Sequence, residues 1–224
     1  MPKLFIICGH GAYDPGAIGF GYTEAERVRA LAAKIKEFGG DNVIVGNTNV
    51  NWYKSNTVNN MNIPKGSLVL ELHMDSSTVA SAKGGHVVID ADFNPDKYDE
   101  ALAEFISGIL PGRSQRLVKR NNLANLNRAQ AADINYRLLE CGFISNADDV
   151  KIFNTRMDDI AKGILKCFNI EPIVKQPVQN NRPWYEEAQK WVKEFGISDG
   201  TRPNDSATRA EVWTMLYSLY KKIK

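Results

Sequence analysis

The sequence predicts an α/β fold, with a mixed, largely parallel central sheet flanked by helices and a small helical C-terminal domain. Within residues 1–170, short apolar runs alternate with amphipathic helical patterns, which is typical of a largely parallel sheet. Residues 171–183 contain three prolines without periodicity and are predicted to be a linker. Residues 184–224 follow with three of the four tryptophans and form the predicted small domain.

The predicted strands are short runs of apolar or β-branched residues that end at glycine or at a polar residue. The first covers residues 4–8 and stops at a glycine, and the third is followed directly by a histidine. The others cover residues 42–45, 67–72, 86–89 and 136–139.

Apolar residues at helical spacing predict the helices. The first begins at Thr23-Glu24 and continues to Phe38, and two more cover residues 96–110 and 148–168. The predicted C-terminal helices cover residues 184–195 and 208–221. The polar segments 47–66 and 114–135 give no clear period, and the first is interpreted as a long loop or broken helix.

Four side chains able to bind a metal or move a proton fall at predicted strand ends or at a helix start. His10, His73 and Glu140 follow predicted strands, and Glu24 opens the first helix. In open α/β sheets, functional groups gather at the carboxyl ends of strands, so these side chains are expected to converge. His10, Glu24 and His73 would offer zinc two imidazoles and a carboxylate. Glu140 would supply the further carboxylate that a hydrolase needs as general base.

Other interpretations of these residues stay open. Glu26 could be the ligand in place of Glu24, which could be a first-turn glutamate favoured by the helix dipole. His10 and His73 could be ordinary strand-end histidines that cap backbone groups. Cys8 and His10 alternate on one strand face, which also allows a Cys–His nucleophile or a thiolate ligand.

Two further features are candidates for contacts with a substrate. His86, on the fourth predicted strand, is interpreted as either structural or substrate-side. The segment 113–128 is either a solvated face or the wall of a groove, with Arg120, Asn121 and Asn122 as candidate contacts. Glu140 itself could be a mere surface carboxylate.

Four motifs occur in the order GHGAYDPGAIG, GYTEAE, ELHMDSS and LLECGFISNADD. Together they resemble the zinc-dependent N-acetylmuramoyl-L-alanine amidases of the phage-lysin and cell-wall-hydrolase type over roughly residues 3–169. The resemblance implies that His10, Glu24 and His73 bind one zinc ion and that Glu140 is the catalytic glutamate. It also implies that the substrate is peptidoglycan, cut at the amide between N-acetylmuramic acid and L-alanine.

The sequence departs from that family at two positions. Asp75 stands where the family often has asparagine, and His86 stands where another strand residue is more usual. Both positions leave the finer choice of substrate open and do not affect the metal set.

Residues 184–224 resemble a single S-layer-homology motif. The resemblance implies that Thr208, Arg209 and Glu211, in the sequence TRAE, contribute to binding a secondary cell-wall polymer. Thr-x-x-Glu before an apolar helix is also a capping box, and both roles are compatible. Because about forty residues rarely bury enough surface to stand alone, we expect the tail to pack on the amidase domain or to form a homodimer.

Composition and charge limit the classes of partner that are expected for this chain. The net charge is +2 and no basic stripe appears, so nucleic acid is not an expected partner. No apolar stretch approaches the ~20 residues that span a bilayer, and no membrane insertion is expected. The amino terminus lacks a signal-peptide pattern. Synthesis in the host cytoplasm is therefore expected, with action on the wall after a separate protein permeabilises the membrane.

The function expected from the sequence is that of a phage endolysin, or a related host autolysin, that hydrolyses peptidoglycan. A wall-binding adaptor with a vestigial metal site is one alternative. A zinc peptidase that cuts within the stem peptide is the other, because it would use the same metal chemistry.

Overall fold

The computed structural model describes residues 2–11, 13–54, 61–173 and 183–224. The chain divides into two compact units, Met1–Val174 and Lys175–Lys224. Residues 174–182 of the predicted linker and 55–60 of the predicted long loop lie outside the described residues.

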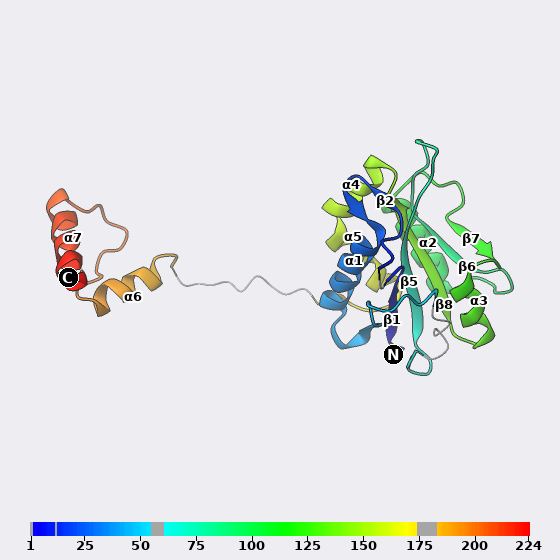
Figure 1. Ribbon diagram of the computed structural model, residues 1–224. Helices are drawn as coiled ribbons and strands as arrows, with labels where there is room; N and C mark the ends of the chain where they lie inside the picture. The colour runs from blue at the N-terminus through cyan, green and yellow to red at the C-terminus, as the bar shows by residue number, and fades with distance from the viewer. Residues whose placement is uncertain (1, 12, 55–60, 174–182) are drawn as a thin grey trace. The chain divides into compact units, whose positions relative to one another are not determined.

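A six-stranded mixed sheet, which is mostly parallel as predicted, organises the first unit (Figure 1). Its strands stand in the order β4-β1-β5-β8-β6-β7, and β6 and β8 are the antiparallel neighbours. The strands are β1 (Leu4–Cys8), β4 (Val43–Val45), β5 (Leu68–Asp75), β6 (His86–Asp90), β7 (Leu117–Arg120) and β8 (Tyr136–Phe143).

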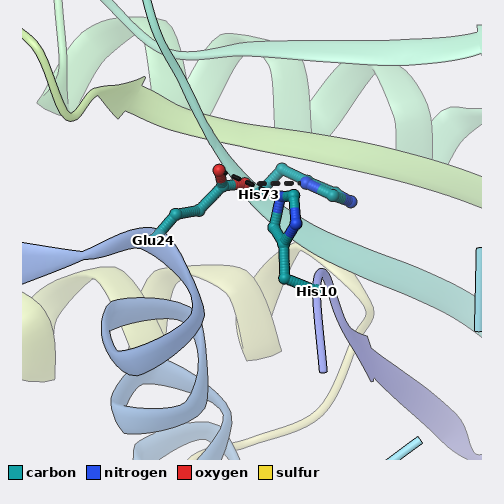
Figure 2. Close-up of side chains that lie close together, drawn as sticks. All are labelled: His10, Glu24 and His73. Carbon is teal, nitrogen blue, oxygen red and sulfur yellow. Dashed lines mark hydrogen bonds and ion pairs between the residues drawn. The ribbon is translucent and has the colours of Figure 1, made fainter. Parts of the chain in front are cut away.

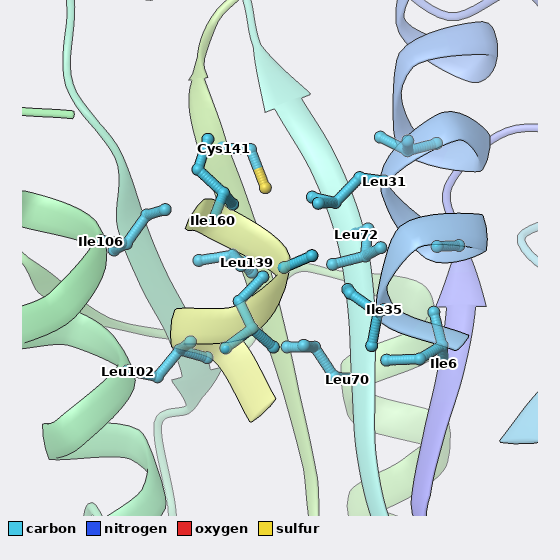
Figure 3. Close-up of a cluster of buried hydrophobic side chains, with 14 of the residues drawn as sticks. Ile6, Leu31, Ile35, Leu70, Leu72, Leu102, Ile106, Leu139, Cys141 and Ile160 are labelled. Carbon is cyan, nitrogen blue, oxygen red and sulfur yellow. The ribbon is translucent and has the colours of Figure 1, made fainter. Parts of the chain in front are cut away.

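Helices cover both faces of this sheet, which is why β1 is buried along its whole length. Helices α1 (Glu24–Gly39), α2 (Lys97–Ile109), α4 (Ala147–Thr155) and α5 (Met157–Cys167) pack their apolar side chains on one face. Figure 3 shows part of this core between α1 and the strands. On the opposite face, α3 (Ala124–Ala131) packs against a second cluster that includes Phe5, Ile7 and Leu138.

Two predicted strands continue further than the sequence indicated. β5 runs two residues beyond His73 and β8 runs three beyond Glu140, so the prediction that both residues end their strands was wrong. Strands β5 and β8 pair with each other up to Asp75 and Phe143, past the point where β1 stops. Mutual pairing therefore extends them without the support of β1.

Several other elements differ from the prediction. The predicted helix over 148–168 is two helices, broken at Arg156, whose φ of −118° lies outside the helical range. The segment 114–135 contains β7 and α3, which were not predicted. A small hairpin, β2 (Ile18–Gly19) and β3 (Tyr22–Thr23), lies between β1 and α1, and the short 3-10 helix η1 (Gly40–Asn42) follows α1.

The C-terminal unit contains α6 (Glu186–Glu194) and α7 (Arg209–Ile223), close to the predicted bounds. The backbone N–H of Glu211 donates to Thr208 Oγ1, and the N–H of Thr208 donates to Glu211 Oε2, so the capping box is present. None of the residues of α6 or α7, all of which are described, is buried. Among the described residues, no helix has the length and apolar character to cross a bilayer.

Candidate metal centre

Three of the predicted side chains, His10, Glu24 and His73, converge beside the sheet (Figure 2). One nitrogen or oxygen from each lies within 4.8 Å of those of the other two. His10 Nε2 is 3.0 Å from Glu24 Oε2, and His73 Nδ1 is 2.8 Å from Glu24 Oε1. The loop after β1, the first turn of α1 and strand β5 thus present three donor groups to one point.

The start of α1 fixes the carboxylate of Glu24. Thr23 is the N-cap, and its hydroxyl accepts the backbone N–H of Glu26. Glu24 Oε2 accepts the N–H of Ala17 at 3.2 Å, and Oε1 accepts the N–H of Met74 at 3.1 Å. The carboxylate is therefore anchored to backbone on two sides, and it is only 4% exposed. Glu26, the alternative ligand, pairs with Arg27 instead.

Two glycines leave room for the imidazoles. A Cβ at Gly9 would lie 2.4 Å from Cε1 of His73. A Cβ at Gly16 would lie 2.7 Å from Cδ2 of His10 and 2.8 Å from Glu24 Oε2. Gly16 also has a φ of +66°, a backbone conformation that favours glycine. Larger residues at either position would displace the groups that form the cluster.

The cluster shifts the pKa of each member. The hydrogen bond with Glu24 raises the pKa of His10. Burial opposes the charged form of His73, but hydrogen bonds to Glu24 and Glu71 outweigh it and raise the pKa of that imidazole. Burial likewise disfavours the ionised form of Glu24, yet hydrogen bonds with both histidines hold the pKa of its carboxyl well below the usual range. A negative charge on Glu24 is therefore built into the site.

Glu140 lies directly beside this cluster. It is the register partner of His73 on β8, and its Oε2 is buried without a hydrogen-bond partner among the described residues. Burial raises the pKa of the Glu140 carboxyl to about 7; the His73 charge opposes this shift, while Asp75 and Glu24 add to it. A carboxyl with this pKa can both accept and return a proton near neutral pH.

A cavity of about 580 Å³ opens onto these four residues. Of the predicted substrate contacts, Arg120 and Asn122 line it, whereas Asn121 does not. Instead, the Asn121 carbonyl accepts a hydrogen bond from the Asn127 side chain. The wall of the cavity also contains Trp52 and Tyr53, which the sequence did not single out.

His86 is 1% exposed and is the cross-strand partner of Glu140 on β6. It does not line the cavity. Burial, together with the charges of Arg113 and Arg120, lowers the pKa of His86 to about 3, so the ring is neutral. Its buried position favours the structural interpretation over direct contact with a substrate.

The Cys–His interpretation is not supported. Burial raises the pKa of the Cys8 thiol to about 11, so the reactive thiolate is scarce at neutral pH. The Cys8 Sγ lies 4.0 Å from the carbonyl oxygen of Val28, within the core.

The groups that hold the histidines were not predicted from the sequence. His10 Nδ1 lies 3.2 Å from Asp14 Oδ2, and His73 Nε2 lies 3.1 Å from Glu71 Oε1. A signal for Glu71 was available, because residues two apart on a strand share a face. Asn125, which donates to Glu71, had no comparable signal, because it lies in the polar segment where α3 was not predicted.

Two nitrogens and one carboxylate oxygen are a donor set that zinc takes in hydrolases, with ligand distances of about 2.0–2.2 Å. One donor atom from each of the three residues lies within 4.8 Å of the other two, near enough for all three to reach one such ion. The residues present therefore fit a zinc ion.

A family model for N-acetylmuramoyl-L-alanine amidases matches residues 4–169. The chain belongs to this family. It is 32% identical over 198 residues to a Staphylococcus aureus protein described as "Probable autolysin PH". The match covers 76% of this chain and 39% of that protein. The chain thus spans about two-fifths of the length of that curated relative.

Solved structures of amidases share the fold. The CwlD amidase from Clostridioides difficile, in complex with the GerS lipoprotein, is 20% identical with a TM-score of 0.61. That match covers 75% of this chain and 100% of the other. The catalytic domain of an endolysin targeting Clostridia Difficile is also 20% identical, with a TM-score of 0.59, over 78% of this chain and 100% of that one.

Proposed function

We propose that this protein is a zinc-dependent peptidoglycan amidase that hydrolyses the amide between N-acetylmuramic acid and L-alanine. The observation that carries the proposal is the convergence of His10, Glu24 and His73, in a chain of this family, next to Glu140. A binding module would have no need of a buried carboxyl beside a three-donor cluster.

His10, Glu24 and His73 would hold one zinc ion. When bound there, zinc polarises the scissile carbonyl and lowers the pKa of water. Such an ion requires an ionised carboxylate and neutral imidazoles, so its binding would use the negative charge of Glu24 and displace any proton held by His10 and His73.

Glu140 is the proposed general base and acid. Its carboxylate takes a proton from the attacking water and delivers it to the departing alanine nitrogen. A pKa of about 7 suits both steps, because the group loses and regains a proton readily near neutral pH. The unpartnered Oε2 supports this role, since no neighbouring donor among the described residues occupies that oxygen.

The cavity beside the cluster is the proposed place of the muropeptide. Arg120 and Asn122 line it and are proposed as substrate contacts, whereas Asn121, between them in the chain, does not line it. His86, an initial candidate for substrate contact, is instead proposed to support Glu140 from the neighbouring strand β6.

The C-terminal unit is proposed to bind a secondary cell-wall polymer through Thr208, Arg209 and Glu211. Glu211 Oε1 also lies 3.2 Å from the Arg202 guanidinium, so these residues form a polar group at the start of α7. Its helices expose large apolar side chains, which supports a homodimer through this unit. Sedimentation of the full chain tests this: a dimer that Trp213→Ser dissociates is expected, and a monomer at all concentrations contradicts it.

Two biological roles follow from the same activity. The likeness in fold to an endolysin catalytic domain supports a phage lysin that lyses its host. The sequence similarity to a probable autolysin supports a host enzyme that remodels its own wall. We propose the endolysin role. Lysis of host cells in which the protein is produced, without lysis of a panel of unrelated bacteria, would support it.

Digestion of purified cell walls tests the activity. We expect new L-alanine amino termini and, by mass spectrometry, glycan strands separated from intact stem peptides, both abolished by a chelator and restored by zinc. Alanine left on muramic acid, with cuts further along the peptide, would indicate the peptidase instead. Binding to walls without any released amino groups would indicate the adaptor.

A further inference from the structure

Each histidine of the cluster is held at both ring nitrogens. His10 turns Nε2 to Glu24 and Nδ1 to Asp14, at 3.0 and 3.2 Å. His73 turns Nδ1 to Glu24 and Nε2 to Glu71, at 2.8 and 3.1 Å. The two imidazoles therefore face the same carboxylate with opposite nitrogens, and each has its own carboxylate behind it.

The carboxylate behind His73 is itself fixed. Both oxygens of Glu71 lie within hydrogen-bond distance of Asn125 Nδ2, at 3.1 and 3.2 Å. The Asn125 Oδ1 accepts from the Arg128 guanidinium, which also donates to the backbone carbonyls of Trp52 and Tyr53. The chain of contacts thus runs from Trp52 and Tyr53 through α3 to Glu71 on strand β5, and it ends at the His73 ring.

Burial makes Glu71 unusual. It is 4% exposed and Asn125 is 6% exposed, on strand β5 and helix α3. Both lie on the sheet face where Val69 and Leu126 belong to an apolar cluster. A carboxylate is costly there unless it is hydrogen-bonded, and an apolar residue would pack at less cost. What Glu71 gains at this position is its contact with His73.

We propose that Glu71, held by Asn125, is a positioning residue that prepares His73 to bind the metal. A carboxylate only accepts hydrogen bonds, so it keeps the proton of the neutral imidazole on Nε2. The lone pair of Nδ1 then points toward Glu24 and the metal. Glu71 is not a member of the three-donor cluster, so it acts through His73.

This inference rests on the proposed function, and zinc affinity tests it. Groups that orient ligating histidines are worth roughly 10- to 100-fold in metal affinity. We therefore expect Glu71→Met to weaken zinc binding by about that factor. Glu71→Gln, which keeps the shape and one acceptor oxygen, should lie between that variant and the native chain. Glu104→Gln, an exposed carboxylate of α2, is the matched control and should leave zinc affinity unchanged.

The measurement is competition for zinc between the full-length chain and a chromophoric chelator, on protein shown to be folded by circular dichroism. Histidine ¹⁵N NMR of the zinc-loaded native chain supplies a second readout, with His73 expected to be metallated at Nδ1 and His10 at Nε2. If Glu71→Met does not fold, Glu71→Gln decides, with at least threefold weaker binding expected.

Different failures have different meanings. If the native chain does not bind zinc, both the proposed function and this inference fail. If it binds zinc, and a folded Glu71 variant binds equally well, only the inference fails. The same holds if Glu71→Met merely lowers the melting temperature of the metal-free protein, or if zinc occupies Nε2 of His73 in the native chain.

Discussion

His73 and Glu140 are register partners on the neighbouring parallel strands β5 and β8. The proposed zinc ligand and the proposed general base are therefore held by the same pair of hydrogen-bonded strands and do not depend on a loop for their separation. An irregularity in the pairing follows immediately, between His73 and Asp75. Since each residue projects from its own strand, we expect mutations to affect zinc binding by His73 and proton transfer by Glu140 separately.

Replacing Glu140 with glutamine should remove activity and leave the metal in place. A general base typically contributes 10²- to 10⁴-fold, so Glu140→Gln should lower kcat by about that factor. Zinc content should stay at that of the native chain, because Glu140 is outside the three-donor cluster. Release of alanine amino groups and metal analysis of the same sample measure both. Retention of most of the activity would remove Glu140 from the mechanism.

The pH dependence of activity should report the same carboxyl. Burial raises the pKa of Glu140 to about 7, and the general base works only when deprotonated. We therefore expect kcat/KM to rise with pH as Glu140 loses its proton, and then to level off. Without a nearby cation the plateau would begin above about pH 7, and the charge of a bound cation should move the rising part of the profile to lower pH. The measurement is initial rates on solubilised wall fragments from pH 5 to 9. Rates that fall steadily across this range would contradict the assignment.

The stability of the metal-free protein should show the cost of this pKa shift. The pKa of Glu140 is about 7 in the folded chain, against an ordinary value of 4.5, so the unfolded chain ionises first as the pH rises. Folding stability is thus lost between about pH 4.5 and 7, by up to roughly 3 kcal/mol. Glu140→Gln should be more stable than the native chain at pH 8 and lose that advantage near pH 4. Urea unfolding at both pH values measures it, and a pH-independent difference would contradict the shift.

Gly9→Ala should disturb His73. The new Cβ would lie 2.4 Å from the imidazole, so the ring must move from its place between Glu24 and Glu71. We expect weaker zinc binding, by at least tenfold if the effect matches that of lost orienting groups. Gly108→Ala on α2 is the matched control, because its Cβ would meet nothing within 4 Å and should stabilise the helix by about 0.5–1 kcal/mol. Equal zinc affinity in the two variants would show that the close approach of Gly9 is unimportant.

Much of the fold and the cluster could be predicted because their signals are local. The apolar run 4–8 and the apolar spacing of α1 fixed where His10 and Glu24 lie relative to the sheet. β7 and α3 could not be predicted in the same way. β7 is half exposed at the sheet edge, and α3 has eight residues, of which only Leu126 and Ala129 join the apolar core.

The residues that orient the site depend on tertiary structure. Asn125 and Glu71 are 54 residues apart in the chain and meet only because α3 packs on the sheet at β6 and β8. His86 is a different case, since a histidine in an apolar strand looks the same in sequence whether it faces a substrate or a core. Its pairing with Glu140 across antiparallel strands depends on β6 reversing direction in an otherwise parallel neighbourhood, which the apolar pattern does not encode.

X-ray absorption at the zinc edge of the purified full-length chain would reveal directly whether His10, Glu24 and His73 bind zinc. We expect one zinc per chain, with two imidazole nitrogens and a carboxylate oxygen at about 2.0–2.2 Å. In the variants His10→Ala and His73→Ala, which each keep Glu24, the imidazole contribution to the spectrum should fall by half. A zinc ion with no imidazole neighbours, or a native chain that hydrolyses walls fully in the presence of a chelator and holds no zinc, would contradict it.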